Sequence, residues 1–247
     1  MKLIFSRFGG KYKKSKEIIE HFENHKIYVE CFLGSGAIFL QKPSVDDCTS
    51  VLNDLDPLVY NIFTKVQELC LNNKTFNNDD YDWIPDKTLW NKFRDEIKKG
   101  DKDLYKSLYV THHSFNGIGN SFTQSRFKNY KYNKNLSIYS DILKNVIIKQ
   151  YDYKDIINQY DSEDTLFYLD PPYDIALKKN YYEYQSGINF IEMVDILKNI
   201  KGKFVLSLDI TPLTTELFKD FNCIEIDFNY NTRKKDKIVK EYIIKNY

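Results

Sequence analysis

Four consecutive residues, Asp170, Pro171, Pro172 and Tyr173, follow an apolar run that ends at Leu169. In an open α/β sheet, ligands bind beyond the carboxyl ends of the strands, so a strand that ended here would place these residues where chemistry takes place. A carboxylate and a backbone carbonyl held by two prolines can accept both N–H bonds of an aromatic amino group. Accepting them favours the pyramidal, nucleophilic nitrogen and disperses its developing positive charge.

Tyr173 adds an aromatic face on which a base extruded from a duplex can stack. The segment therefore favours transfer of an electrophilic group to a ring amino group. The same residues also fit a simple turn, in which the two prolines end the strand and Asp170 caps it. Other segments are needed to distinguish these interpretations.

A second segment, VECFLGSG over residues 29–36, places two glycines after a short apolar run. Glycines here let the backbone approach a cofactor, and Asp54, about twenty residues on, could bind ribose hydroxyls. The pair also fits a tight turn. NAD and S-adenosylmethionine are both compatible with it, but the third glycine of the dinucleotide fingerprint is absent, which disfavours NAD.

A third segment, RFGGK over residues 7–11, combines a flexible backbone with positive charge. Such a loop suits a carboxylate ligand, such as that of the methionine half of S-adenosylmethionine. A plain loop with a solvated lysine is the alternative.

In this order the three segments resemble the DNA adenine methylase family, over most of the chain apart from a central insert. The DPPY and G-G-K pieces carry most of the specificity. The resemblance implies S-adenosylmethionine as cofactor and methylation of the N6 amino group of a flipped-out adenine in double-stranded DNA. Because no Pro-Cys nucleophile stands beside the motif, we expect direct in-line transfer without a covalent enzyme intermediate.

Residue by residue, the resemblance implies a catalytic tetrad at Asp170, Pro171, Pro172 and Tyr173, with Asp170 also against the cofactor. The closing segment from Glu241 resembles the final strand of the family. Two positions depart from the pattern of the family. Arg7 stands where an aromatic residue is usual, and Phe8 could take the role of that residue. Cys31 replaces a proline. The other residues expected at the cofactor are Arg7, Phe8, Gly10, Lys11, Glu30, Phe32, Gly34, Gly36, Asp54, Asp152 and Tyr153.

The elements that must position these residues alternate between strand and helix, which indicates a parallel sheet. We expect an α/β fold, a Rossmann-like methyltransferase sheet with helices on both faces, formed by residues 1–56 and 141–247. A mostly helical target-recognition insert should occupy residues 57–140. Apolar periodicity predicts helices over 15–25, 58–71, 89–97, 104–110, 188–200 and 214–218, and a helix start at 37–40. It predicts strands over 27–32, 50–54, 146–148, 165–169, 203–208, 223–228 and 238–244.

The insert is the expected DNA-binding region. No acidic residue lies between positions 111 and 140, where basic and aromatic residues alternate in a way that suits phosphate contacts and stacking. The FNG segment at 115–117 resembles the start of the DNA-contacting hairpin of the family, and beyond it the resemblance fades. An ordinary solvated surface is the alternative. The residues expected at DNA are Asn116, Arg126, Lys128, Lys131 and, in a second basic segment, Arg233.

Net charge, cysteine spacing and the length of apolar runs restrict the other classes of protein that the sequence could represent. A net charge of +1 does not by itself indicate a nucleic-acid partner. The four cysteines form no C-x-x-C pair, which disfavours a zinc site or a disulfide framework and suits a reducing compartment. No apolar run approaches a membrane span or a signal sequence. We expect a cytoplasmic, DNA-associated monomer without metal. Methylation of cytosine N4, RNA adenine or a protein glutamine, a catalytically silent DNA-binding relative, and an NAD-dependent enzyme stay open.

Overall fold

The computed structural model describes residues 1–124, 131–173, 188–232 and 235–247, with side chains described outside 228–239. Within them a seven-stranded sheet has the order β3-β2-β1-β4-β5-β7-β6. The first five strands pair in parallel and β7 is antiparallel to both neighbours. The strands are β1 (Ile27–Glu30), β2 (Thr49–Asn53), β3 (Ile147–Lys149), β4 (Thr165–Leu169), β5 (Lys203–Asp209), β6 (Asn222–Thr232) and β7 (Lys235–Lys245).

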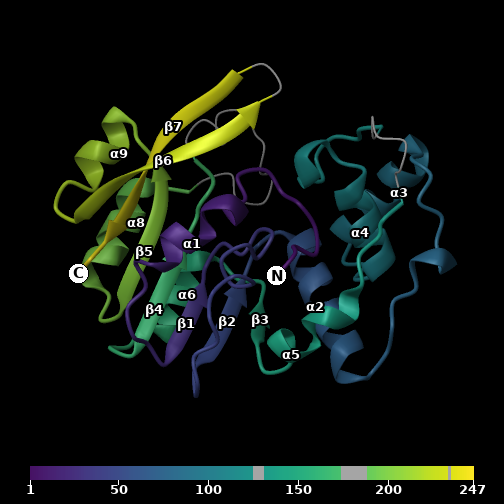
Figure 1. The fold of residues 1–247 in the computed structure, drawn as a ribbon, viewed down its shortest axis with the longest axis horizontal. Helices are drawn as coiled ribbons and strands as arrows, with labels where there is room; N and C mark the ends of the chain where they lie inside the picture. Colours follow the sequence, from purple (N-terminus) through teal and green to yellow (C-terminus); the bar gives the residue numbers. More distant parts are fainter. Residues whose placement is uncertain (125–130, 174–187, 233–234) are drawn as a thin grey trace.

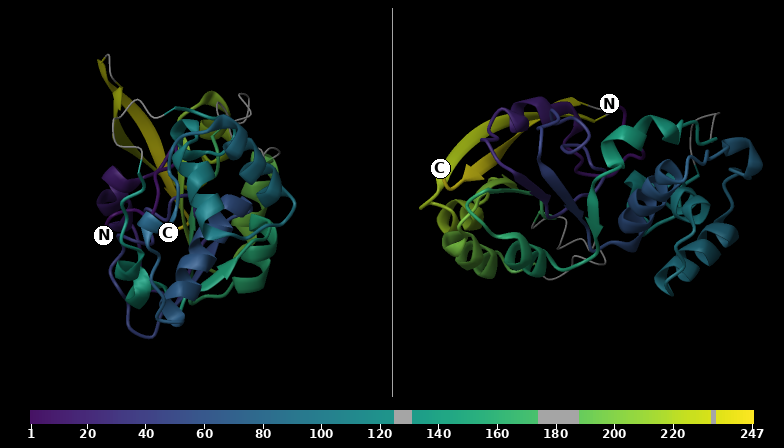
Figure 2. Two further views of the ribbon diagram at one scale, coloured as in Figure 1. Left: turned by 90° about the vertical axis from the view of Figure 1, so that its right-hand side faces the viewer. Right: turned by 90° about the horizontal axis from the view of Figure 1, so that it is seen from below.

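Helices cover both faces of this sheet. Successive residues of a strand point to opposite sides, and in β1 the residues on both sides are apolar and pack against helices. Tyr28 of β1 joins a core cluster that includes Ile18 of α1 and Ile62 of α2. The next residue, Val29, joins the cluster of Ile156 of α6 with the residues of α8 and α9. Figures 1 and 2 show the two layers, and the expected α/β class is confirmed. The helices are α1 (Ser15–Ile19), α2 (Pro57–Leu71), α3 (Lys87–Lys98), α4 (Leu104–His112), α5 (Ser140–Leu143), α6 (Tyr153–Tyr160), α8 (Phe190–Asn199) and α9 (Pro212–Leu217).

The region between β2 and β3 is mostly helical and lies beside the sheet, at the right of Figure 1. Helix α4 packs against both α2 and α3. The core of this region is continuous with the core on one face of the sheet, since Trp90 of α3 and Leu108 of α4 belong to the same cluster as Tyr28. Short 3-10 turns complete the fold at η1 (Tyr12–Lys14), η2 (Asn78–Asp80), η3 (Phe115–Gly117) and η4 (Leu136–Tyr139). No helix in the described ranges is both long and apolar enough to cross a membrane.

Four expected elements differ from the structure. The helix predicted over 15–25 ends at Ile19, after which Phe22 packs against Tyr28, with ring centroids 5.8 Å apart. No helix is formed over 37–40, where the backbone makes turns and the Phe39 amide donates to the Glu30 carboxylate at 3.1 Å. The two final strands are longer than predicted, since their antiparallel pairing continues to Thr232 and Lys235.

Candidate active site

The turns after β1, β2 and β3 are joined by one buried amide. From the end of β2, Asn53 donates through Nδ2 to the carbonyls of Cys31 at 3.0 Å and Tyr151 at 2.9 Å. Its Oδ1 accepts the Tyr151 amide at 2.9 Å. Sequence reasoning missed this residue, although an asparagine that ends an apolar strand was a signal for it. The amide fixes the edge of the sheet at which ligands bind in parallel α/β folds.

The glycine segment forms a tight turn over this edge. Gly34 and Gly36 have φ values of +52° and +68°, a region that favours glycine. The two carboxylate oxygens of Asp54 accept the Gly34 amide at 2.7 Å and the Asp56 amide at 2.9 Å. Burial raises the pKa of Asp54 to about 6, and the charge of Arg7 opposes the rise. Asp54 therefore holds the turn, and its contact with a ribose stays a prediction.

The two glycines meet different surroundings. A Cβ on Gly34 would find no atom within 4 Å, whereas one on Gly36 would lie 2.6 Å from the Phe63 ring. A Cβ on Gly10 would lie 3.2 Å from the Ser35 hydroxyl, so the RFGGK loop and the glycine turn are adjacent. That buried hydroxyl has no hydrogen-bond partner among the residues described. The turn thus presents open backbone at Gly34 beside an unpartnered polar group.

An aromatic pair continues the same edge. The rings of Phe32, after β1, and Tyr153, at the start of α6, have centroids 5.4 Å apart at 33°. The Tyr153 phenol is buried and, in the described part of the chain, without a hydrogen-bond partner. Asp152 caps α6 by accepting the Lys154 amide at 3.0 Å. A planar ring with polar substituents fits such a surface. These polar atoms and the open turn fit S-adenosylmethionine.

The predicted catalytic segment follows β4 directly. Pro171 and Pro172 are buried, and the side chain of Asp170 is 19% exposed. The Lys11 ammonium donates to Asp170 Oδ1 at 2.8 Å and to the Gly9 carbonyl at 3.2 Å. The same ammonium lies 4.7 Å from the centre of the Tyr173 ring. The structure therefore brings the first and third predicted segments into direct contact.

A carboxylate from β7 completes this group. Glu241 Oε2 accepts the Tyr173 hydroxyl at 2.6 Å and lies 3.7 Å from Lys11 Nζ. Burial raises the pKa of Asp170 to about 6, with Lys11 opposing the rise and Glu241 adding to it. For Lys11, burial alone would lower the pKa, but Asp170 and Glu241 outweigh it and raise the pKa. Lys11 is therefore a cation between two carboxylates.

Two of the expected cofactor residues are engaged within the protein. Glu30 accepts the Tyr28 hydroxyl at 2.8 Å in addition to the Phe39 amide, and burial raises its pKa to about 8. Arg7 forms a buried ion pair with Asp56, the N-cap of α2, at 2.5 Å. A cofactor contact of either residue, and of the exposed Phe8, stays a prediction.

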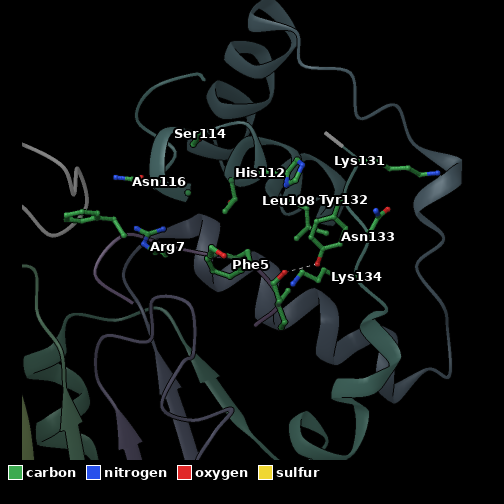
Figure 3. Close-up of a pocket in the computed structure, with 15 residues that line it drawn as sticks. Phe5, Arg7, Leu108, His112, Ser114, Asn116, Lys131, Tyr132, Asn133 and Lys134 are labelled. Atoms are coloured by element: carbon green, nitrogen blue, oxygen red, sulfur yellow. Dashed lines mark hydrogen bonds between the residues drawn. The ribbon is translucent and has the colours of Figure 1, made fainter. Parts of the chain in front are cut away.

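Asn116 and Lys131, two of the candidate DNA-binding residues, line a pocket of about 510 Å³ between the segment before η1 and the insert. In Figure 3, Arg7 and Asn116 stand at one end and Lys131 at the other. The Asn116 carbonyl accepts the Phe8 amide at 2.9 Å, and Lys131 forms an ion pair with Asp79. The expected contacts Arg126, Lys128 and Arg233 lie outside the described residues.

The chain is similar to known methyltransferases. The chain is 25% identical over 273 residues to the Type II methyltransferase M1.LlaDCHI of Lactococcus lactis subsp. cremoris, covering 97% of this chain and 93% of the relative. More remote similarity is found to the solved structure of a precorrin-6y C5,15-methyltransferase from Geobacter metallireducens GS-15, with a TM-score of 0.41, 11% identity and coverage of 95% and 87%. A second solved structure of remote similarity is that of the yhhF protein of Escherichia coli, with a TM-score of 0.42 and 10% identity, covering 99% of this chain and 89% of that chain. The family assignment does not depend on these two.

The sequence profile of one family matches residues 8–232, which include the glycine turn, the cap of α6 and the catalytic segment. The chain therefore belongs to the D12 class of N6 adenine-specific DNA methyltransferases.

Proposed function

We propose that S-adenosylmethionine is the methyl donor for N6 methylation of adenine in double-stranded DNA by this protein, and that Asp170 to Tyr173 hold the flipped-out base. The observation that carries the proposal is the half-buried Asp170 carboxylate after β4, held by Lys11, whose neighbour Gly10 lies against Ser35 of the glycine turn. Carboxylates with raised pKa values in such positions are frequent in active sites.

The cofactor would lie along the turns after β1, β2 and β3. Phe32 and Tyr153 would contact its adenine ring, and the backbone at Gly34 with the Ser35 hydroxyl would bind its polar groups. When bound, S-adenosylmethionine supplies a sulfonium methyl carbon, whose bond to sulfur breaks, leaving its electron pair on sulfur, as the bond to the amino nitrogen forms. The cap formed by Asp152 would keep Tyr153 in place.

The amino group of the adenine would donate its two N–H bonds to the Asp170 carboxylate and the Pro171 carbonyl. These acceptors oppose delocalisation of the lone pair and stabilise the positive charge on nitrogen. Asp170 can also receive the proton that the nitrogen loses, because its raised pKa makes it a better base than an exposed carboxylate. The Tyr173 ring would stack on the base.

The DNA would lie over the pocket between the segment before η1 and the insert. Asn116 and Lys131, with Arg126, Lys128 and Arg233, are proposed to contact it. We further propose that the enzyme acts as a cytoplasmic monomer. The Type II relative supports a place in a restriction–modification pair.

Incubation of DNA with the protein and methyl-labelled S-adenosylmethionine, followed by digestion to nucleosides, tests the proposal. We expect labelled N6-methyl-2′-deoxyadenosine from DNA, and a loss of at least about a hundredfold in Asp170→Ala with DNA binding retained. Labelled N4-methylcytosine, or label in RNA alone, would refute the choice of substrate. A protein that gives no calorimetric signal with S-adenosylmethionine would be a silent relative.

A further inference from the structure

Glu241 lies outside the residues that match the family profile, yet it contacts two members of the candidate site. Its side chain is only 1% exposed. In the sheet it stands opposite Asp209, the last residue of β5. A carboxylate at this depth requires partners, and Tyr173 and Lys11 provide them.

The charges around Asp170 show what Glu241 contributes. Methyl transfer places positive charge on the amino nitrogen, which the Asp170 carboxylate stabilises. Lys11, at 2.8 Å from that carboxylate, cancels most of its charge. Glu241, at 3.7 Å from Lys11, restores a net charge of −1 to the group of three.

The hydrogen bond from Tyr173 is a second contribution. The phenol donates to Glu241 Oε2 at 2.6 Å, a length typical of bonds to a charged acceptor. The bond fixes the far end of the ring on which the base is proposed to stack. A strand residue thus anchors a side chain that otherwise belongs to a loop.

We propose that Glu241 is a positioning residue for methyl transfer, which holds the Tyr173 ring and neutralises Lys11 so that the group of three keeps a net negative charge toward the adenine amino group. The inference rests on the proposed function, because it assigns the base to Asp170 and Tyr173. Glu241 touches neither substrate nor cofactor in this scheme.

The pH dependence separates this role from a structural one. Activity requires ionised Asp170, so the rate falls as the pH falls through the Asp170 pKa of about 6. The groups that face Asp170 are Lys11, Tyr173 and Glu241, with Glu30 from the adjacent strand β1 and Tyr168 from β4 itself. Removal of the Glu241 charge should lower the Asp170 pKa and move the acid limb to lower pH.

Single-turnover methylation of DNA, followed from pH 5 to 9, tests the inference in Glu241→Gln. This variant keeps an acceptor oxygen and removes the charge. We expect the plateau rate to fall roughly 10- to 100-fold, as for residues that orient a directly acting group. The acid limb should shift downward at the same time, whereas loss of packing alone would lower the rate without moving the limb.

Two further variants complete the test. Glu225→Gln makes the same change on β6, where the exposed Glu225 pairs with Lys240, and should match the wild type. Tyr173→Phe removes only the anchored hydroxyl and should lower the plateau, and a wild-type rate would refute the anchoring role even if Glu241→Gln failed to fold. If Glu241→Gln behaves like Glu225→Gln, the inference is wrong although the proposed function stands. An inactive wild type would refute the proposed function instead.

Discussion

Alanine at Gly34 and at Gly36 should affect different properties of the protein, although the two glycines are two residues apart. Both have left-handed backbone, with φ of +52° and +68°. For a residue with a Cβ this conformation costs about 1–2 kcal/mol. Neither substitution can avoid that cost, so both variants should be less stable than the wild type.

The surroundings of each Cβ decide what is added. At Gly36 the new methyl group would lie 2.6 Å from the Phe63 ring, which is fully buried in α2. Overpacking of a core costs about 1–3 kcal/mol, so Gly36→Ala should lose about 2–5 kcal/mol in total. At Gly34 the methyl group meets no atom within 4 Å, so Gly34→Ala should lose only the backbone contribution.

For cofactor affinity, in contrast to stability, Gly34→Ala should have the larger effect. The open space at Gly34 is where the backbone is proposed to approach S-adenosylmethionine, and a methyl group there should weaken binding at least tenfold, about 1.4 kcal/mol. Urea unfolding without cofactor gives the stability, and calorimetric titration gives the affinity. Gly100→Ala is the matched control, since Gly100 has φ of +101°, open surroundings and a place after α3, away from the site.

Two results would refute this reasoning. Wild-type affinity for S-adenosylmethionine in Gly34→Ala would mean that the glycine turn does not contact the cofactor. Equal stability of Gly34→Ala and Gly36→Ala would mean that Phe63 moves aside without cost.

Two other predictions concern stability. Asn53→Ala should lower the free energy of unfolding by about 1–3 kcal/mol, because buried carbonyl and amide groups of the turns lose their partner; unchanged urea unfolding would contradict this. Burial of His113, together with the charge of His112, lowers the His113 pKa from 6.5 to about 4. The unfolded chain therefore binds a proton that the folded chain does not, so the contribution of His113 to stability should fall as the pH falls from about 6.5 to about 4. On going from pH 7.5 to 5, the unfolding midpoint of His113→Phe should change in a more favourable direction than that of the wild type, and an equal change would assign the effect to other groups.

The sequence predicted the sheet well because its strands are short apolar runs that end in polar residues or turns. The strand over 165–169 was predicted at both ends, and the catalytic segment follows it as expected. Prediction was less accurate where packing against residues outside the segment contributes. The pattern over 15–25 predicted one helix, yet the helix ends at Ile19 and Phe22 packs against Tyr28. No local pattern contains that contact.

The same reason explains which site residues the sequence could indicate. Asp170, Lys11 and the glycines stand in motifs whose neighbours identify them. Glu241 was visible only as part of a final strand, because its role depends on contacts with Lys11, 230 positions earlier, and with Tyr173. Likewise, the local excess of basic residues predicted that Lys131 contacts DNA, but that local pattern does not contain Asp79, with which Lys131 forms an ion pair.

Because β7 is antiparallel, it can place a side chain at the site from within a paired strand, which a parallel strand could not do. A parallel strand reaches the carboxyl edge of the sheet only at its last residue, where the backbone leaves the ladder. Because β7 runs the other way, Glu241 lies opposite the end of β5 while still inside a strand that is paired on both sides. Side chains on strands are held more firmly than those on loops. Lys11 and Tyr173 both come from loops, so the residue that contacts both is the one whose backbone the sheet fixes.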